Sequence, residues 1–259
     1  MAVYAIADLH LSHAVDKPMD VFGPRWENHT ERIRENWMNT VGPEDTVVIP
    51  GDLSWGMDIS EAEEDLLFIE GLPGRKILLK GNHDYWWMTM NKLRECTERL
   101  GLRTVSFLFN NAYEAEDFVI CGTRGWLLDN LPSPHDEQIM LREAGRLRRS
   151  VEAGEVLLRD HPEKEMILFL HYPPAYGLQR NPPVLDAVRD SPATQIFYGH
   201  MHNADPERLV PQIAGIPSRL VAADWLEFQP MRILPTGANR GKRNEKRTEE
   251  PSGTNETED

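Results

Sequence analysis

Cysteine is scarce in this sequence, which has only two among 259 residues, Cys96 and Cys121. Two thiols cannot form the disulfide framework of a small secreted domain, so we interpret both as core residues in a reducing compartment. A secretory leader is also missing, because the apolar run at residues 3–6 is short and follows no basic segment. We therefore expect a cytoplasmic protein.

Long hydrophobic runs and an excess of positive charge are both absent. No apolar stretch reaches the roughly 20 residues needed to cross a bilayer, so no membrane association is expected. The formal net charge is −14, with 42 acidic and 28 basic residues. Such a surface repels polyanions, which argues against general nucleic-acid binding. A small phosphate ester remains compatible with this charge, since bound cations invert the local field.

The residues that are present suit one α/β domain, because the hydrophobic fraction of 40% can form a real core. Short apolar runs, continuous rather than alternating, predict strands that are covered on both faces. These runs are residues 3–6, 46–49, 77–79, 166–170 and 195–198. Further strands are expected at 118–121, 209–213, 218–222 and 226–233. The last of them are separated by little helix and could be antiparallel.

Helices are expected between these strands, at residues 27–41, 60–69, 84–100 and 134–158. The first has Trp37 and Met38 on its periodic apolar positions. Ser60 with Glu63 is the pattern of a capping box, which predicts where the second helix begins. The fourth is long and highly charged, and it could pack either as a lid or along a flank of the domain.

The composition changes near the end of the sequence. Residues 237–259 contain no large apolar side chain and are rich in charge, Gly, Asn and Thr. Such a segment cannot bury enough apolar surface to offset the entropy lost on ordering. We therefore expect one domain at residues 1–236 and a disordered tail at 237–259.

Polar residues follow each of the five central strands. Because the carboxyl ends of parallel strands meet at one edge of a sheet, these side chains should lie together. Seven of them are metal ligands by type: Asp8, His10, Asp52, Asn82, His171, His200 and His202. Imidazole, carboxylate and carboxamide donors without thiolate favour Mn, Fe, Co, Ni or Zn. Seven ligands are too many for one open catalytic ion and suit two ions that share a carboxylate.

Each motif alone has an ordinary explanation. An Asp-x-His pair usually lies on the surface without binding a metal, and Gly51-Asp52 is a common turn sequence. His171 alone would most simply be a satisfied core histidine. The motif Gly81-Asn82-His83-Asp84 is more specific, because three polar groups follow a glycine that lets the backbone turn sharply. The placement of all five motifs after apolar strands favours one shared metal site.

The motifs, in this order, resemble the calcineurin-like metallophosphoesterase superfamily over roughly residues 1–235. They are Asp8-x-His10, Gly51-Asp52, Gly81-Asn82-His83-Asp84, His171 and Gly199-His200-x-His202. The segments Tyr85-Trp86-Trp87 and Gly122-Thr123-Arg124-Gly125-Trp126 are similar to those of a bacterial branch of predicted phosphohydrolases. The resemblance implies an α/β fold in the form of a four-layer αββα sandwich, with a dinuclear metal site at its strand ends.

The resemblance also implies how the ligands are shared between two divalent ions, with Mn or Fe favoured. Asp8, His10 and His202 would hold one ion, and Asn82, His171 and His200 the other. Asp52 would bridge the two ions.

The chemistry expected of such a centre is phosphate-ester hydrolysis. Two cations about 3.5–4 Å apart lower the pKa of a shared water, and the resulting hydroxide attacks phosphorus in line with the leaving oxygen. We assign His83 as general acid or phosphate-orienting cation, with Asp84 fixing its tautomer; alternatively, His83 only caps the following helix. Asn82 and Arg124 are candidate substrate-binding residues. Arg124 could equally hold its own loop through a carboxylate.

Hydrolysis of a small phosphorylated metabolite is the favoured function of this compact, acidic chain. A phosphodiesterase or pyrophosphohydrolase acting on cyclic nucleotides or nucleotide-linked metabolites is the alternative, since the same metal core serves both. The sequence leaves the oligomeric state open. A non-catalytic metal-binding scaffold is a third hypothesis, and the intact ligand set together with His83 argues against it.

Overall fold

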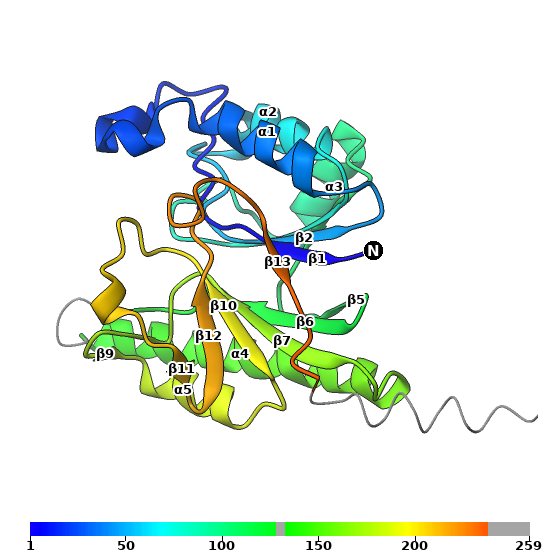
Figure 1. The fold of residues 1–259 in the computed structure, drawn as a ribbon, viewed down its shortest axis with the longest axis vertical. Helices are drawn as coiled ribbons and strands as arrows, with labels where there is room; N and C mark the ends of the chain where they lie inside the picture. Colours follow the sequence, from blue (N-terminus) through cyan, green and yellow to red (C-terminus); the bar gives the residue numbers. More distant parts are fainter. Residues whose placement is uncertain (128–132, 238–259) are drawn as a thin grey trace, which may run out of the picture.

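The computed structural model describes residues 1–127 and 133–237. Two β-sheets pack face to face, and helices cover the outer face of each sheet (Figure 1). This arrangement confirms the expected α/β fold and its four αββα layers.

The first sheet combines the N-terminal half of the chain with its last strand, in the order β13-β1-β2-β3-β4. Its parallel strands are β1 (Val3–Ala5), β2 (Thr46–Pro50), β3 (Arg75–Leu79) and β4 (Val105–Phe107). The edge strand β13 (Met231–Ile233) pairs antiparallel with β1, as the sequence suggested. The outer helices are α1 (His29–Thr40), α2 (Ile59–Glu70) and α3 (Met90–Leu100). Two short 3-10 helices, η1 (Met19–Phe22) and η2 (Pro24–Trp26), precede α1.

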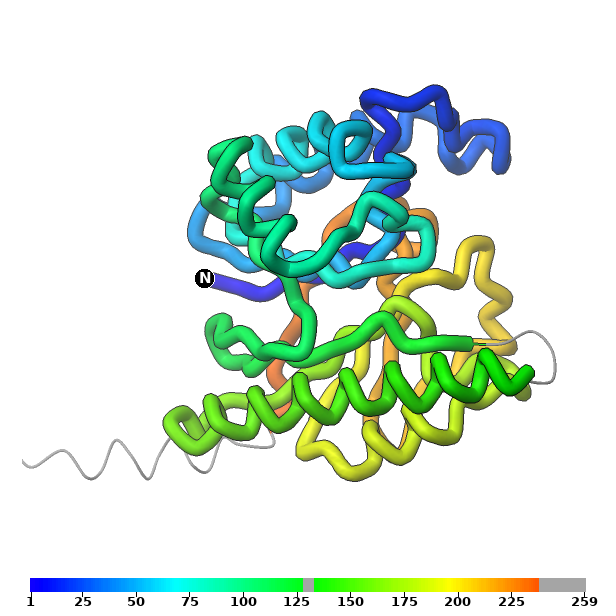
Figure 2. Tube along the Cα trace, turned by 180° about the vertical axis from the view of Figure 1, so that it is seen from behind, coloured from blue at the N-terminus to red at the C-terminus, as the bar shows by residue number. Residues whose placement is uncertain are grey.

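The second sheet has the order β11-β12-β10-β7-β6-β5. Its parallel strands are β6 (Phe118–Thr123), β7 (Glu165–Leu170), β10 (Gln195–Tyr198) and β12 (Ile216–Leu220). Antiparallel strands β5 (Tyr113–Ala115) and β11 (Gln212–Ile213) form its edges. Helices α4 (Pro134–Asp160) and α5 (Pro182–Arg189) cover it, and Figure 2 shows α4 running along this layer. The hairpin of β8 (Ala175–Tyr176) and β9 (Gln179–Arg180) and the 3-10 helix η3 (Pro206–Arg208) lie in its connections.

The apolar side chains form three clusters, one in each interface between layers. In β2, Val47 packs beneath the outer helices, whereas Val48 points between the two sheets. In β7, Leu168 packs against the layer of α4 and α5, whereas Ile167 and Phe169 face the other sheet. Because successive strand residues point to opposite faces and both faces are buried, the central strands are continuously apolar.

The start of α2 differs from the expected capping box. The N-cap is Asp58, whose carboxylate accepts hydrogen bonds from the backbone N–H groups of Ser60 and Glu61. The prediction that Ser60 and Glu63 cap this helix was therefore wrong. Aspartate is as good an N-cap as serine, and here it lies two residues earlier.

Two other helical expectations need correction. The helix expected from residue 84 begins at Met90, because Asp84 is fully buried and binds backbone N–H groups of neighbouring loops. Met38 of α1 is 57% exposed, so it does not belong to the buried face that contains Trp37. The charged helix was correctly expected, and it extends to Asp160.

The structure also bears on the expectations for the two cysteines and for membrane-spanning segments. Cys96 and Cys121 are both buried free thiols, as interpreted. None of the helices in the described ranges is both long and apolar enough to span a bilayer. The expected tail lies outside the described residues, apart from Gly237.

Candidate metal centre

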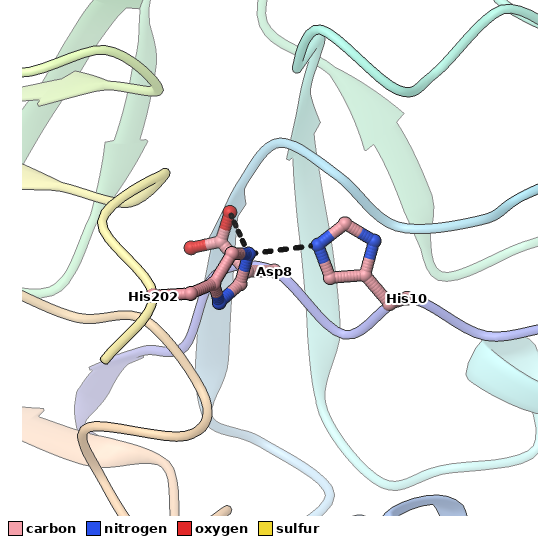
Figure 3. A group of neighbouring side chains, drawn as sticks. All are labelled: Asp8, His10 and His202. Carbon is pink, nitrogen blue, oxygen red and sulfur yellow. Dashed lines mark hydrogen bonds and ion pairs between the residues drawn. The ribbon is translucent and has the colours of Figure 1, made fainter. Parts of the chain in front are cut away.

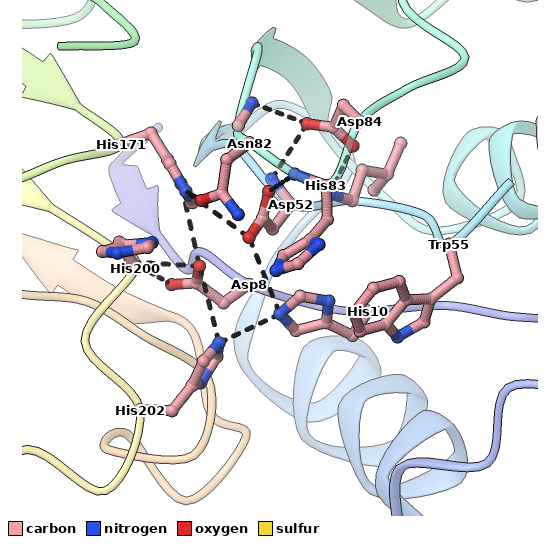
Figure 4. A network of polar contacts seen from close by, with 12 residues as sticks. Asp8, His10, Asp52, Trp55, Asn82, His83, Asp84, His171, His200 and His202 are labelled. Atoms are coloured by element: carbon pink, nitrogen blue, oxygen red, sulfur yellow. Dashed lines mark hydrogen bonds and ion pairs between the residues drawn. The ribbon is translucent and has the colours of Figure 1, made fainter. Parts of the chain in front are cut away.

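Loops from both sheets bring the seven predicted ligands into one cluster (Figure 4). The loops after β1, β2 and β3 come from the first sheet, and those after β7 and β10 come from the second. The ligands form two groups, and within each group the ligand atoms lie within 4.8 Å of one another. The groups are Asp8, His10 and His202 (Figure 3), and Asp52, His171 and His200.

Asp52 lies between these two groups. Its Oδ2 atom is 3.4 Å from Nε2 of His171 and 3.8 Å from Nε2 of His10. The same oxygen is buried and has no hydrogen-bond partner among the described residues. The amide oxygen of Asn82 is 2.6 Å from Nε2 of His171, so Asn82 joins the second group. A buried carboxylate oxygen without a partner is costly unless a cation binds it, and this one faces both groups.

The electrostatics of the cluster also favour cations. Burial raises the pKa of Asp8 well above its ordinary value, and the neighbouring charge of Asp52 raises it further. Burial likewise raises the pKa of Asp52, with a further contribution from Asp84. Burial and nearby imidazoles lower the pKa of His10 and His171. Neutral imidazole is the form that ligates metal, and divalent cations would favour the ionised carboxylates. The donor set therefore fits two divalent ions of borderline or hard character.

Four of the ligands have left-handed backbone conformations. The φ angles are 59° for Asp8, 47° for His10, 53° for Asp52 and 70° for His200. Such angles are uncommon for residues other than glycine, and they concentrate at functional sites where the surroundings hold them. Here the first two loops hold each other, because the N–H groups of Asp8 and His10 donate to the carbonyls of Gly51 and Asp52.

Two glycines give the loops room to approach each other. A Cβ atom at Gly199 would lie 2.5 Å from Oδ2 of Asp8, and one at Gly81 would overlap Asp52. Neither glycine has a positive φ angle, so glycine is needed at both positions because a side chain would not fit. The structure therefore adds a steric reason for the glycine at position 81, where a turn was expected.

Asp84 organises the loops around the ligands. Its carboxylate accepts hydrogen bonds from the backbone N–H groups of Asp52, Leu53 and Gly81 and from the indole N–H of Trp86. No hydrogen bond joins Asp84 to His83 in the described parts of the chain. The expectation that Asp84 fixes the His83 tautomer was wrong, because these N–H groups already occupy its oxygens.

His83 borders the cluster without belonging to either ligand group. Its backbone N–H donates to Oδ1 of Asp52 at 2.8 Å, and its ring centroid lies 5.5 Å from that of His10 (Figure 4). Burial and the nearby His202 lower the pKa of His83. It does not cap the following helix, whose N-cap is Thr89. Its ring also packs against Trp55, with 4.4 Å between the centroids.

Arg124 lies on the loop after β6. Its guanidinium is 3.7 Å from the carboxylate of Glu143 on α4 and stacks over the ring of Trp126 at 5.1 Å. The structure therefore shows the alternative considered for Arg124, in which a carboxylate, here that of Glu143, holds its loop. The Nε atom of Arg124 is buried and has no hydrogen-bond partner among the described residues.

Sequence reasoning missed two residues that position ligands. Asp224 is buried, and its carboxylate lies 3.1 Å from Nδ1 of His202 and accepts from the backbone of Asn203. Burial opposes ionisation of Asp224, yet these hydrogen bonds leave its pKa below the ordinary value. Trp55 stacks on the ring of His10 at 4.8 Å. Asp224 follows the apolar residues 221–223, which is the same signal that identified the ligands.

Comparisons with known proteins agree with this geometry. The profile of the calcineurin-like phosphoesterase family matches residues 1–204. The Gene 66 protein of Mycobacterium phage D29 is 42% identical over 84 residues, which are 32% of this chain and 40% of that protein. The Gene 66 protein of phage L5 is 36% identical over 78 residues, which are 30% of this chain and 37% of that protein. The chain thus spans well under half the length of these curated relatives.

A solved structure shows the same fold. Phosphopantetheinyl hydrolase from Mycobacterium tuberculosis aligns over 90% of this chain and 96% of its own, with a TM-score of 0.50 and 14% sequence identity. At this identity the likeness concerns the fold alone. The family profile covers most of the chain, including nearly all of the residues that form the cluster. The chain therefore belongs to the calcineurin-like phosphoesterase family, and its described residues include two groups that could hold metal ions.

Proposed function

We propose that the chain is a dinuclear hydrolase of small phosphorylated metabolites. The observation that supports two ions rather than one is the position of Asp52, whose buried and unpartnered oxygen faces imidazoles of both ligand groups. A single ion would leave several of the seven ligands without a purpose in a buried, polar cluster.

The proposed ion sites follow the two groups. Asp8, His10 and His202 would hold one ion, Asn82, His171 and His200 would hold the other, and Asp52 would contact both. When bound, Mn or Fe ions would polarise the phosphoryl group and lower the pKa of a water molecule between them. Asp224 and Trp55 keep His202 and His10 oriented toward the ions.

The remaining roles belong to side chains beside the ions. His83 donates a proton to the leaving oxygen; its ring borders the cluster beside His10, which supports this role. Asn82 turns its amide oxygen toward His171, which leaves its NH₂ group able to donate to a phosphate oxygen.

A hollow of about 260 Å³ adjoins the cluster and suits a small leaving group. Its lining is largely aromatic and apolar, with Trp26, Trp55 and Phe22 beside His10 and His83. This volume is below the usual range of about 300–1,000 Å³ for drug-sized ligands, so a compact organic group fits better than a protein segment.

A comparison of two aryl esters tests the proposal. The Mn-reconstituted protein should hydrolyse p-nitrophenyl phosphate with a higher kcat/KM than bis(p-nitrophenyl) phosphate, and chelator-treated protein should hydrolyse neither. Asp186→Asn, at an exposed carboxylate of α5, serves as the matched control for carboxylate changes in the cluster. Absence of turnover in protein with both ions present would overturn the proposal.

A phosphodiesterase or pyrophosphohydrolase is the second candidate. It is favoured by a second, cationic hollow next to the same loops, because a diester or pyrophosphate has groups on both sides of the bridging phosphorus. Faster hydrolysis of the bis ester in the same assay would select this candidate.

A further inference from the structure

A second hollow, of about 590 Å³, is lined by cationic side chains although the chain as a whole has a net charge of −14. The cations are Lys80, Arg124, Arg142 and Arg146. Most of the remaining lining is apolar and includes Trp87 and Phe109. Four cations around one hollow repel each other, so their proximity in an acidic protein requires an explanation.

One carboxylate accounts for only part of this charge. Glu143 of α4 is fully buried and pairs with Arg146 and, at 3.7 Å, with Arg124. The hydroxyl of Thr123 donates to the other oxygen of Glu143 at 2.8 Å. Glu143 therefore orients two guanidinium groups. The charge of Asp84 also acts on Lys80, but no carboxylate among the described residues forms an ion pair with Arg142. The Nε atom of Arg124 remains buried without a hydrogen-bond partner in the described ranges.

The hollow shares two loops with the metal centre. Lys80 lies two residues before Asn82, and the lining residues 87–90 follow the same loop. The backbone carbonyl of Arg124 accepts from the N–H of Tyr172, the neighbour of His171. These shared loops place the hollow beside the metal centre.

We propose that this cationic hollow binds a second anionic group, a phosphate or a carboxylate, of the substrate whose scissile phosphate lies at the ions. The assignment to substrate rests on the proposed function. Guanidinium forks match the planar or tetrahedral oxygens of such anions, and the pairing with Glu143 reduces the entropy lost on binding. Trp87 and Phe109 offer apolar surface to the carbon skeleton between the two anionic groups. The substrate class is thus a small metabolite with a phosphate ester and another anionic group.

Anion binding to the Mn-loaded protein gives the first test. Calorimetric titration with inorganic phosphate should show two sites, one at the ions and one in the hollow. Arg142→Gln, an exposed position on α4, should weaken the second site about tenfold, which is the effect of losing one charge-assisted hydrogen bond. Arg148→Gln removes the same charge from an exposed position of the same helix outside the hollow and should leave both sites intact. Malonate in place of phosphate shows whether a carboxylate also binds.

One phosphate site in the unaltered protein, or equal effects of the two substitutions, would overturn the proposal. This result does not depend on turnover, so it is separate from a failure of the proposed function.

Hydrolysis gives the second test, with phenyl phosphate compared with its 2-, 3- and 4-carboxyphenyl analogues. At least one carboxylated ester should have a kcat/KM about tenfold above that of phenyl phosphate, and Arg142→Gln should remove this preference. The preference should survive in Arg148→Gln. If no isomer is preferred, or if Arg142→Gln keeps the preference, the hollow does not bind a substrate group.

Discussion

At the residue scale, a second polar group orients two of the ligand imidazoles, those of His202 and His171. Asp224 holds Nδ1 of His202, which leaves Nε2 of that ring directed toward Asp8. A carboxylate in this position fixes the tautomer of a ligating imidazole and increases its basicity. The same argument applies to His171, whose Nδ1 lies 3.1 Å from the carbonyl oxygen of Pro50.

We predict that Asp224→Asn weakens binding of the ion held by His202. Loss of such an outer carboxylate typically lowers metal affinity about 10- to 100-fold, because the imidazole becomes a poorer and less oriented ligand. Competition with a metal-binding dye measures this affinity. Asp186→Asn is the control, and an affinity equal in the two variants would show that Asp224 does not support the ligand.

A second prediction at this scale concerns His83. His83→Ala should retain both ions and lose about 10²- to 10⁴-fold in turnover, the usual contribution of a positioned acid. The checks are metal content and the kcat for p-nitrophenyl phosphate. His135→Ala, at an exposed histidine, should behave like the unaltered protein. Undiminished turnover of His83→Ala would exclude the proton-donor role.

The residue types of the ligands could be predicted because each polar motif directly follows an apolar strand. The roles of Asp84 and Asp224 could not be predicted, since their partners are N–H groups or rings from other loops. The left-handed conformations of Asp8 and His200 also have no local sequence signal, because contacts between loops maintain them.

At the element scale, the central strands and the start of α4 were predictable, whereas the start of α3 was not. Strands β2 and β7, which end at Pro50 and Leu170, are buried on both faces, so their apolar composition identifies them. The start of α3 was misplaced by several residues, because Asp84 is used by the metal loops and does not begin a helix. Where a polar residue has two possible uses, local pattern cannot select the one that tertiary contacts require.

Lys76 of β3 gives a prediction about pH and stability. Its side chain is fully buried and donates to the carbonyl of Leu72 at 2.6 Å, and burial lowers its pKa from 10.5 to about 8. Between these values the unfolded chain holds a proton that the folded chain has released. The free energy of unfolding should therefore rise with pH in this window by about 1.4 kcal/mol per pH unit from this residue.

Lys76→Met removes this titration while keeping a long side chain. The stability of the unaltered protein relative to the variant should increase from pH 8 toward pH 10.5 and stay constant below that window. Denaturant unfolding at several pH values measures the difference, in which other titrating groups cancel. A difference independent of pH across this window would contradict the lowered pKa.

At the scale of the whole molecule, the metal centre joins the two halves of the sandwich. Asp8, His10, Asp52 and Asn82 come from the first sheet, whereas His171, His200 and His202 come from the second. Neither half contains a complete ligand group, since Asp8 lies with His202 and Asp52 with His171. Ions bound there would contact ligands from both sheets, so ion binding would also stabilise the packing of the two sheets against each other.

The four-layer arrangement was accessible from the sequence only through the family resemblance. Continuous apolar runs predict buried strands, but they do not show that these strands divide between two sheets. That division depends on which face of each strand meets the other sheet, as for Val48 and Phe169. The cationic hollow likewise depends on α4 lying beside the loop of Arg124.

The central claim is that two ions share the carboxylate of Asp52, and metal content measured by elemental analysis tests it most directly. After reconstitution with Mn and removal of free metal, the unaltered protein should hold two equivalents per chain. Asp52→Asn should lose more metal than the same substitution at Asp8, because Oδ2 of Asp52 lies near the Nε2 atoms of His10 and His171, one from each ligand group. Two full equivalents in Asp52→Asn would contradict the account.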